Sequence, residues 1–290
     1  MKGAVFRKGP DYGKSWHKFS NNYLSQVGLG VVALVAVIAI FAPYMAPYPS
    51  NAGFFVNYPE AHEPPNWIHI FGTDQFGRDV LSRIMFGFRY SLMMAVVVLS
   101  LVVPLGVVLG LVAGYYRGGK VDMVVMRCAD IFLAVPPLVL ALSICSVLTP
   151  SVFNAMMAVS LMWWPWYTRL VYSISSSLRN EAFVQAAEIA GASPFHIIFR
   201  EILPNCLGPI LTKITLDAGW VILIGASLSF VGLGAQPPIP DLGTMVSDGA
   251  NFLPEQWWVS LFPALAIVLV ILGFNLLGDG VRDLFAAETV

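Results

Sequence analysis

The chain contains 290 residues, of which 57% are hydrophobic and only 11% are charged, whereas soluble domains have about 25% charged residues. The apolar residues form long blocks, so the composition excludes an ordinary soluble protein and predicts a polytopic membrane protein. A formal net charge of −1 gives no indication of a nucleic-acid partner. The three cysteines lie far apart without disulfide or metal-ligand spacing, so no metal site is predicted; they are Cys128, Cys145 and Cys206.

The N-terminal part of the chain changes character twice. Residues 1–26 are polar and basic, and they predict a tail that lies outside the membrane. Residues 27–46 form an apolar run that is long enough to span the bilayer, so we expect a first transmembrane helix here and not a cleaved signal peptide. Residues 47–90 are rich in Pro, Asn and aromatic residues and predict an extracytoplasmic loop. Its last part predicts an amphipathic helix in the membrane interface, with arginines that reach toward lipid headgroups.

Five further apolar blocks complete six predicted transmembrane helices, and the expected fold is therefore all-α. The blocks are 91–115, 124–148, 152–172, 206–231 and 257–277, and a short tail follows at 286–290. In the first of these blocks, Gly106, Gly110 and Gly114 recur at four-residue spacing. This spacing places the three glycines on one helix face, which favours close packing against another helix.

The lysines and arginines predict the orientation of the chain in the membrane. With the N-terminus in the cytoplasm, thirteen of the sixteen fall on the cytoplasmic side and only Arg78, Arg83 and Arg89 fall outside. This is a strong positive-inside bias. It predicts that both termini and the polar segment 179–205 are cytoplasmic.

A few polar and aromatic residues within the spans are candidates for a translocation path. Asp130 and Asp217 are ionisable residues in or near apolar blocks, which makes each a candidate for substrate passage. The alternative is structural pairing, of Asp217 with Lys213 one turn earlier and of Asp130 with Arg127. Trp163 and Trp166 belong to an aromatic cluster that fits either packing or the lining of a path.

Segment 179–205 is a polar stretch between two apolar blocks, and its pattern predicts two short amphipathic helices. The first has a predicted apolar face opposite its polar residues, and Gly191 ends it. Ser193 is placed to cap the second helix, Pro194 fits its first position, and Pro204 is expected to end it. The predicted apolar face of the first helix is Phe183, Ala186, Ala187 and Ala190, opposite Glu181, Gln185 and Glu188.

A compact helix pair on the inner side of a membrane protein is suited to docking a cytoplasmic partner. Segment 185–204 resembles the EAA loop of ABC importer permeases, whose pattern is E-A-A-x3-G-x9-I-x-L-P. Gln185 replaces the glutamate of that pattern and Glu201 replaces its isoleucine. The resemblance therefore implies docking through shape, since the first acidic side chain of the pattern is missing.

The wider sequence resembles the C-type permease of dipeptide, oligopeptide and nickel importers, in segments 71–92, 130–138, 232–245 and 275–283. The resemblance implies a permease core at 91–285, a homologous B-type partner permease, two cytoplasmic ATPases that bind ATP–Mg, and an extracytoplasmic solute-binding protein. It further implies that this chain binds no cofactor itself and carries out no covalent chemistry. Peptides are the expected cargo, with nickel or oligosaccharides as alternatives. The implied ATPase-coupling residues within 181–204 are Glu181, Gln185, Ala186, Ala187, Gly191, Ala192, Ser193 and Pro204.

Two other classes of function are weaker alternatives. A secondary transporter or channel would be expected to show inverted repeats, and no clear repeat is present. A membrane-embedded enzyme would require catalytic groups within the spans, yet all four histidines lie outside them; they are His17, His62, His69 and His196. No catalytic residue is therefore predicted.

Overall fold

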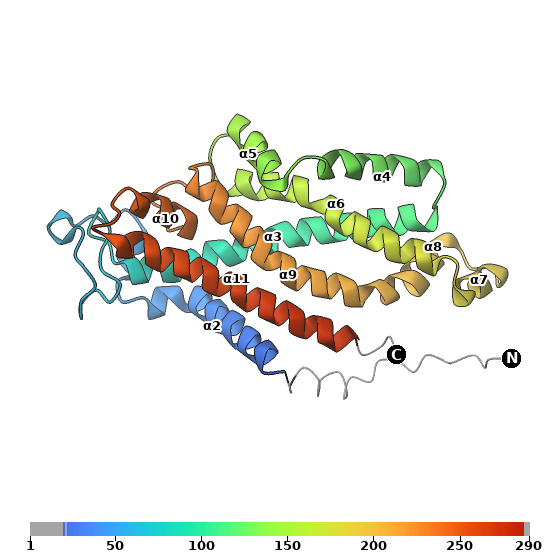
Figure 1. Ribbon diagram of the computed structural model, residues 1–290, viewed down its shortest axis with the longest axis horizontal. Helices are drawn as coiled ribbons and strands as arrows, with labels where there is room; N and C mark the ends of the chain where they lie inside the picture. Colours follow the sequence, from blue (N-terminus) through green and yellow to red (C-terminus); the bar gives the residue numbers. More distant parts are fainter. Residues whose placement is uncertain (1–19, 21, 287–290) are drawn as a thin grey trace.

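The computed structural model describes residue 20 and residues 22–286, so most of the predicted tails at 1–26 and 286–290 lie outside the described residues. The described part is elongated and all-helical, and its long helices run roughly along one common direction (Figure 1). Apart from one isolated bridge between Thr73 and Asp79, residues 22–286 contain no strand pairing. The predicted all-α fold class is therefore confirmed.

Ten α-helices and three shorter turns are assigned within the described residues. The α-helices are α2 (Tyr23–Met45), α3 (Val80–Tyr115), α4 (Lys120–Leu133), α5 (Pro137–Val147), α6 (Val152–Leu178), α7 (Ala182–Ile189), α8 (Pro194–His196), α9 (Leu203–Phe230), α10 (Leu242–Ala250) and α11 (Trp257–Ala286). The shorter turns are the 3₁₀ turns η1 (Pro49–Ala52) and η2 (Tyr58–Glu60) and the π turn η3 (Ile197–Ile202).

Four of the described helical stretches are long and apolar enough to cross a membrane, and they are centred on α2, α3, α9 and α11. Helices α4 and α5 together could make a fifth, although they are bent by 85° at the break between them. The block 124–148 is thus two helices joined at a bend and not one continuous helix. Pro137 explains the break, because a residue that precedes proline avoids the helical conformation, and Pro136 is accordingly extended with ψ 131°.

The prediction of a separate interfacial helix before residue 91 is wrong. The segment from Val80 onward is the first part of α3, which continues unbroken for 36 residues. Arg78 and Arg83 do not reach toward headgroups, because both are buried within the protein and paired with Asp74. Among the described residues of this region only Arg89 is an exposed arginine.

Among the described residues, α3 and α6 form the most extensive helix–helix contact, and the three evenly spaced glycines of α3 make it possible. A Cβ atom on Gly106 would lie 2.6 Å from Tyr167 Cβ, and one on Gly110 would lie 2.6 Å from the carbonyl oxygen of Thr168. A Cβ atom on Gly114 would lie 2.6 Å from Ser175 Cβ. These distances are too short for any side chain, so glycine is required for α3 and α6 to approach so closely.

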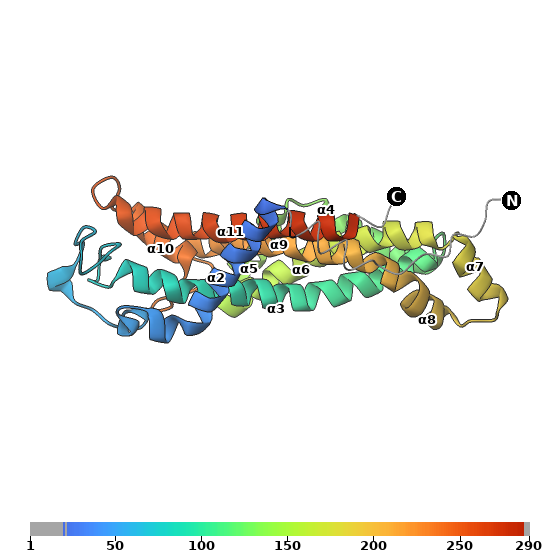
Figure 2. The same cartoon turned by 90° about the horizontal axis from the view of Figure 1, so that it is seen from below.

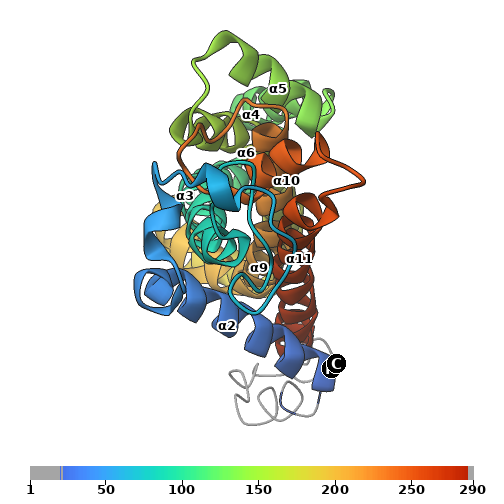
Figure 3. The same cartoon turned by 90° about the vertical axis from the view of Figure 1, so that its left-hand side faces the viewer.

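The other helices surround this pair. Helix α11 packs against α2 and α9, whereas α4 and α5 cover α6 on the opposite side, as the end view shows (Figure 3). The α6–α9 loop, residues 179–205 with α7 and α8, lies at one end of the molecule. The segments 47–79 and 231–256 gather at the other end (Figures 1 and 2). The α6–α9 loop and these two segments therefore lie at opposite ends of one helical body.

We predict that Gly110→Ala destabilises the protein by about 1–3 kcal/mol, because the added methyl group overlaps backbone atoms of α6. Gly30→Ala in α2 is the matched control, since a Cβ atom there meets nothing within 4 Å. It should be neutral or stabilising by about 0.5–1 kcal/mol through helix propensity. Thermal unfolding of both variants in detergent measures the difference, and equal effects would contradict the packing explanation.

Candidate functional site: the α6–α9 loop

Helix α7 forms between two well-defined ends. Glu181 is its N-cap residue, although the Glu181 side chain makes no capping hydrogen bond. Gly191 ends the helix with φ +82°, a left-handed conformation that glycine adopts without strain. The Ala192 amide then donates to the Ala187 carbonyl at 3.0 Å, which closes the end of α7. The predicted role of Gly191 as a helix stop is thus explained by its backbone conformation.

The second predicted helix of the pair is not a separate element. Ser193 Oγ accepts a hydrogen bond from the His196 amide at 3.3 Å, and Pro194 occupies the first helical position. The helix then runs through α8 and η3 directly into α9. Pro204 does not end it, because Pro204 lies in the first turn of α9, directly after a π turn that accommodates the proline. The second half of the loop is therefore the rigid start of the α9 span.

The structure also corrects the predicted apolar face of α7. Val184 is fully buried, and it packs together with Ala187 in a cluster that includes Leu111 of α3 and Ile197 of η3. Ala186, Ala190 and Gln185 are exposed. Three large apolar side chains of α7 and α8 are also exposed, to different extents: Phe183 (37%), Phe195 (72%) and Ile189 (89%). We call these three residues, with Ala186 and Ala190, the outer apolar face.

The polar residues of the loop have different surroundings. Gln185 Nε2 donates to the carbonyl of Asn180 at 3.2 Å, which fixes this amide beside the start of α7. Glu188 was predicted to lie on the solvent side, but its carboxylate accepts hydrogen bonds from Tyr115 and Arg179. Its inward position was missed because the sequence pattern assigned the wrong face of α7 to the interior.

The candidate path residues fall into a buried group and an exposed group. Asp217 is buried, forms an ion pair with Lys213 at 3.1 Å and accepts a hydrogen bond from Trp163 Nε1 at 2.9 Å. This agrees with the predicted pairing of Asp217 with Lys213. Trp163 is itself buried, so both side chains are engaged within the protein.

The exposed group lies on α4 and α6. The prediction that Asp130 pairs with Arg127 is wrong, because Asp130 pairs with Arg169 of α6. Both side chains of this pair are partly exposed. Trp166, three residues before Arg169, is also exposed, and Lys213 Nζ lies over its ring, 5.8 Å from the ring centre. An ionisable residue within an apolar span is itself a functional signal, and it could have identified Arg169 from sequence.

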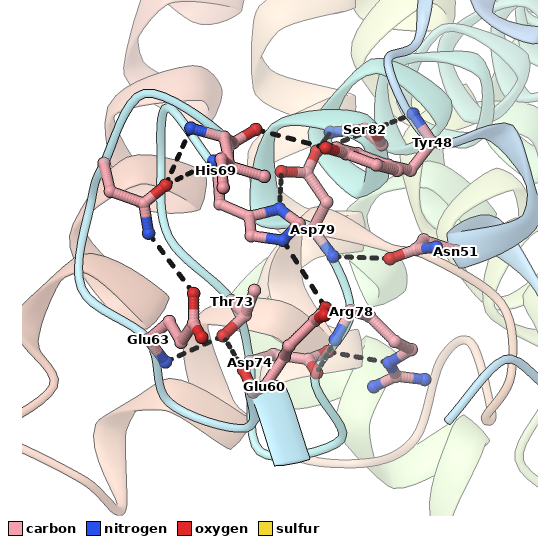
Figure 4. Close-up of polar contacts among 12 residues, drawn as sticks. Tyr48, Asn51, Glu60, Glu63, His69, Thr73, Asp74, Arg78, Asp79 and Ser82 are labelled. Carbon is pink, nitrogen blue, oxygen red and sulfur yellow. Dashed lines mark hydrogen bonds and ion pairs between the residues drawn. The ribbon is translucent and has the colours of Figure 1, made fainter. Parts of the chain in front are cut away.

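A buried polar cluster organises the opposite end of the molecule (Figure 4). Asp79 caps α3 by accepting hydrogen bonds from the amide and the hydroxyl of Ser82, at 2.7 and 2.6 Å. Its other carboxylate oxygen lies 3.0 Å from His69 Nδ1, and the Asp79 amide donates to Asn51 Oδ1 at 2.7 Å. Segments around residues 51, 69 and 79 are therefore held together at the start of α3.

Two arginines share one carboxylate in the same region. Arg78 Nε lies 2.7 Å from Asp74 Oδ2, and Arg83 Nε lies 3.6 Å from that oxygen. Arg83 also donates to the carbonyl of Asn51 at 3.1 Å. Asp248 of α10 faces this group: burial raises the pKa of its carboxyl, and the positive charges of Arg83 and Arg78 offset part of that rise. The cluster thus connects segment 47–79 to the start of α3 and to the neighbouring helix α10.

Comparison with known proteins identifies the family. Residues 106–289 match the family model of the binding-protein-dependent transport system inner membrane component. The chain belongs to this family. Residues 12–65 of this permease also match the N-terminal transmembrane domain of oligopeptide transport permease C.

Close relatives extend over almost the whole permease. The dipeptide transport system permease protein DppC of Alkalihalophilus pseudofirmus is 42% identical over 270 residues, which cover 93% of this chain and 88% of that protein. The protein of the same name in Escherichia coli is 44% identical over 271 residues, with coverage of 92% and 90%. Among solved structures, a chain of the inward-facing MetNI methionine ABC transporter has a TM-score of 0.58 at 19% identity. It covers 71% of this chain and 96% of that chain, and it shows a shared fold.

We predict that Gly191→Val abolishes transport by the permease, because a β-branched residue is strained at φ +82° and would displace the end of α7. Gly191→Asn is the matched control, since asparagine tolerates this conformation and no atom lies within 4 Å of an added Cβ. Transport by reconstituted variants is the measurement. Loss of transport in both variants would show that glycine is needed at position 191 because any side chain there blocks a contact, and not because of the backbone conformation.

We predict that Asp74→Asn lowers stability by about 3–5 kcal/mol, because it leaves two buried guanidinium groups without their shared carboxylate. Glu63→Gln, in the same segment, is the control and should change stability by less than about 0.5 kcal/mol. Thermal unfolding of the purified permease measures both, and a stable Asp74→Asn variant would contradict the assigned ion pairing.

Proposed function

We propose that the chain is the transmembrane permease subunit of an ATP-driven ABC importer for di- or oligopeptides. The observation that carries the proposal is the outer apolar face of α7 and α8, which is held at one end of the helical body. The chain's membership of the transport-system family supports the same function. Exposed Phe183, Ile189 and Phe195 side chains at the end of a membrane protein are typical of a docking surface. The names of the two DppC relatives support peptides as the cargo.

In this proposal the α6–α9 loop docks in a groove of a cytoplasmic ATPase. The residues with which it does so are those of the resemblance, from Glu181 through Gln185, Ala186, Ala187, Gly191, Ala192 and Ser193 to Pro204. Shape and apolar contact carry the docking, since Gln185 is uncharged and is bonded to the chain's own backbone. ATP–Mg binds and is hydrolysed on the two partner ATPases, and this chain performs no covalent chemistry.

The proposed topology has six spans with both termini in the cytoplasm. Helix α6 is the sixth span, since its 27 residues reach about 40 Å and it packs along α3. The bent pair α4–α5 then counts as one span. This topology places the α6–α9 loop in the cytoplasm and the cluster of Figure 4 on the outside. The outer segments 47–79 and 231–256 are the proposed surface for a solute-binding protein.

The translocation path is proposed to lie along the exposed face of α4 and α6, between this chain and a B-type partner permease. The partly exposed ion pair of Asp130 and Arg169 supports this placement, because charged side chains within spans face water or protein and not lipid. Trp166 of α6 is also exposed. Asp217 and Trp163 are proposed to support the path from behind, through their buried hydrogen bond.

The substrate class is tested by binding and uptake. Reconstituted importer with its binding protein should take up labelled di- or oligopeptides on addition of ATP. Uptake of nickel or an oligosaccharide instead would replace the cargo, and uptake driven by an ion gradient without ATP would contradict the ABC importer assignment itself.

We predict that Ile189→Glu releases the ATPase subunits from the purified complex, because it introduces a charge at the most exposed large side chain of the outer apolar face. Ile68→Glu is the matched control, since Ile68 is also exposed, at 69%, but lies at the opposite end of the molecule. Co-purification of the ATPases with each variant is the measurement. Full ATPase retention by Ile189→Glu would contradict the docking surface.

A further inference from the structure

The carboxylate of Glu188 is the centre of a group of contacts at the inner end of the helical body. Arg179 binds it with two nitrogens, Nη2 at 2.8 Å from Oε1 and Nη1 at 2.9 Å from Oε2. The Tyr115 hydroxyl donates to Oε1 at 2.9 Å. The Arg179 guanidinium also stacks over the Tyr115 ring, 4.7 Å from its centre. The three side chains therefore all contact one another.

These three residues come from three different helices. Tyr115 is the last residue of α3, Arg179 caps the C-terminus of α6, and Glu188 lies in the last turn of α7. The chain itself connects α7 only to α6 and α9. The contacts of Glu188 add α3, which has no covalent connection to the loop.

The geometry of these contacts makes the connection between α7 and the helices α3 and α6 strong. A bidentate arginine–carboxylate pair is directional and stronger than a single ion pair, and the tyrosine hydroxyl adds a third charge-assisted hydrogen bond. The side chains of Arg179 and Glu188 are only 31% and 32% exposed, and Tyr115 is buried. The fully buried Val184, one turn earlier on the same face of α7, adds apolar contact beside them.

We propose that Glu188 is a positioning residue that fastens the ATPase-coupling helix α7 to α3 and α6. This proposal rests on the proposed function. A displacement of α7 by the ATPases is then delivered to the α3–α6 pair, which the glycine contacts make one body, as well as to α9. Gln185 bonds only within the loop, so Glu188 provides the acidic contact that links α7 to the spans.

The experiment uses the complete importer, with partner permease, ATPases and binding protein, reconstituted in vesicles. Glu188→Gln and Tyr115→Phe are compared with Tyr116→Phe, a matched control that removes the hydroxyl of a 45% exposed tyrosine and keeps the edge-on contact between its ring and the Tyr115 ring. Retained ATPase, peptide-stimulated ATP hydrolysis and peptide uptake are measured for each. A double variant, Arg179→Glu with Glu188→Arg, restores the ion pair with reversed charges.

We expect Glu188→Gln to retain the ATPases but to transport about five- to tenfold fewer peptides per ATP hydrolysed, since the charge-assisted bonds are lost. Tyr115→Phe should show a smaller loss in the same ratio, Tyr116→Phe none, and the double variant should recover most of the uptake. If Glu188→Gln does not accumulate in the membrane, Tyr115→Phe carries the test, because it removes a single oxygen.

An unchanged ratio of uptake to hydrolysis in both Glu188→Gln and Tyr115→Phe would overturn the proposal. The proposal would also be overturned if the double variant took up no more peptide than Glu188→Gln. The same holds if uptake fell only in proportion to the loss of bound ATPase. Failure of the wild-type complex to bind ATPases would instead remove the proposed function. The two failures are therefore distinguishable.

Discussion

The close approach of α3 and α6 is the constraint on which the rest of the structure depends. Lipid gives two apolar helices no hydrophobic reason to associate, so their packing relies on dispersion contacts between surfaces that fit. Gly106, Gly110 and Gly114 provide a smooth face on α3, against which backbone and Cβ atoms of α6 lie directly. The pair extends from the buried polar cluster of Figure 4 to the α6–α9 loop and connects the two ends of the molecule.

Polar contacts hold the two ends of this pair in place. At the end shown in Figure 4, Asp79 and Asp74 join the start of α3 to preceding segments through buried hydrogen bonds and ion pairs. At the opposite end, Glu188 joins the last residue of α3 to α6 and α7. The contacts of these charged groups offset the cost of removing them from water, because each group has close, correctly oriented partners. The apolar middle and the polar ends thus stabilise the same helix pair by different physical means.

The loop itself combines a fixed inner side with an unpartnered outer side. Val184 and Glu188 attach α7 to the helical body, while Phe183 and Ile189 are exposed. Because α8 and η3 continue into α9, the second half of the loop has no hinge at Pro204. A surface that is apolar, exposed and rigidly connected to several spans is suited to receive force from a partner, which agrees with the proposed role of the loop.

Much of the fold could be predicted from sequence, because hydropathy and helix-ending residues act locally. The apolar blocks, the stop at Gly191 and the cap at Ser193 all depend on nearby residues, and the glycine spacing indicated a packing face before its partner was known. Only the tertiary structure decided which side of α7 is buried, since an eight-residue helix with apolar residues on both sides does not specify its own interior. It also decided that Asp130 pairs with Arg169, that Arg78 and Arg83 are buried, and that Glu188 meets Tyr115. Each of these depends on a partner from another part of the chain, and position in the sequence does not determine which distant groups folding brings together.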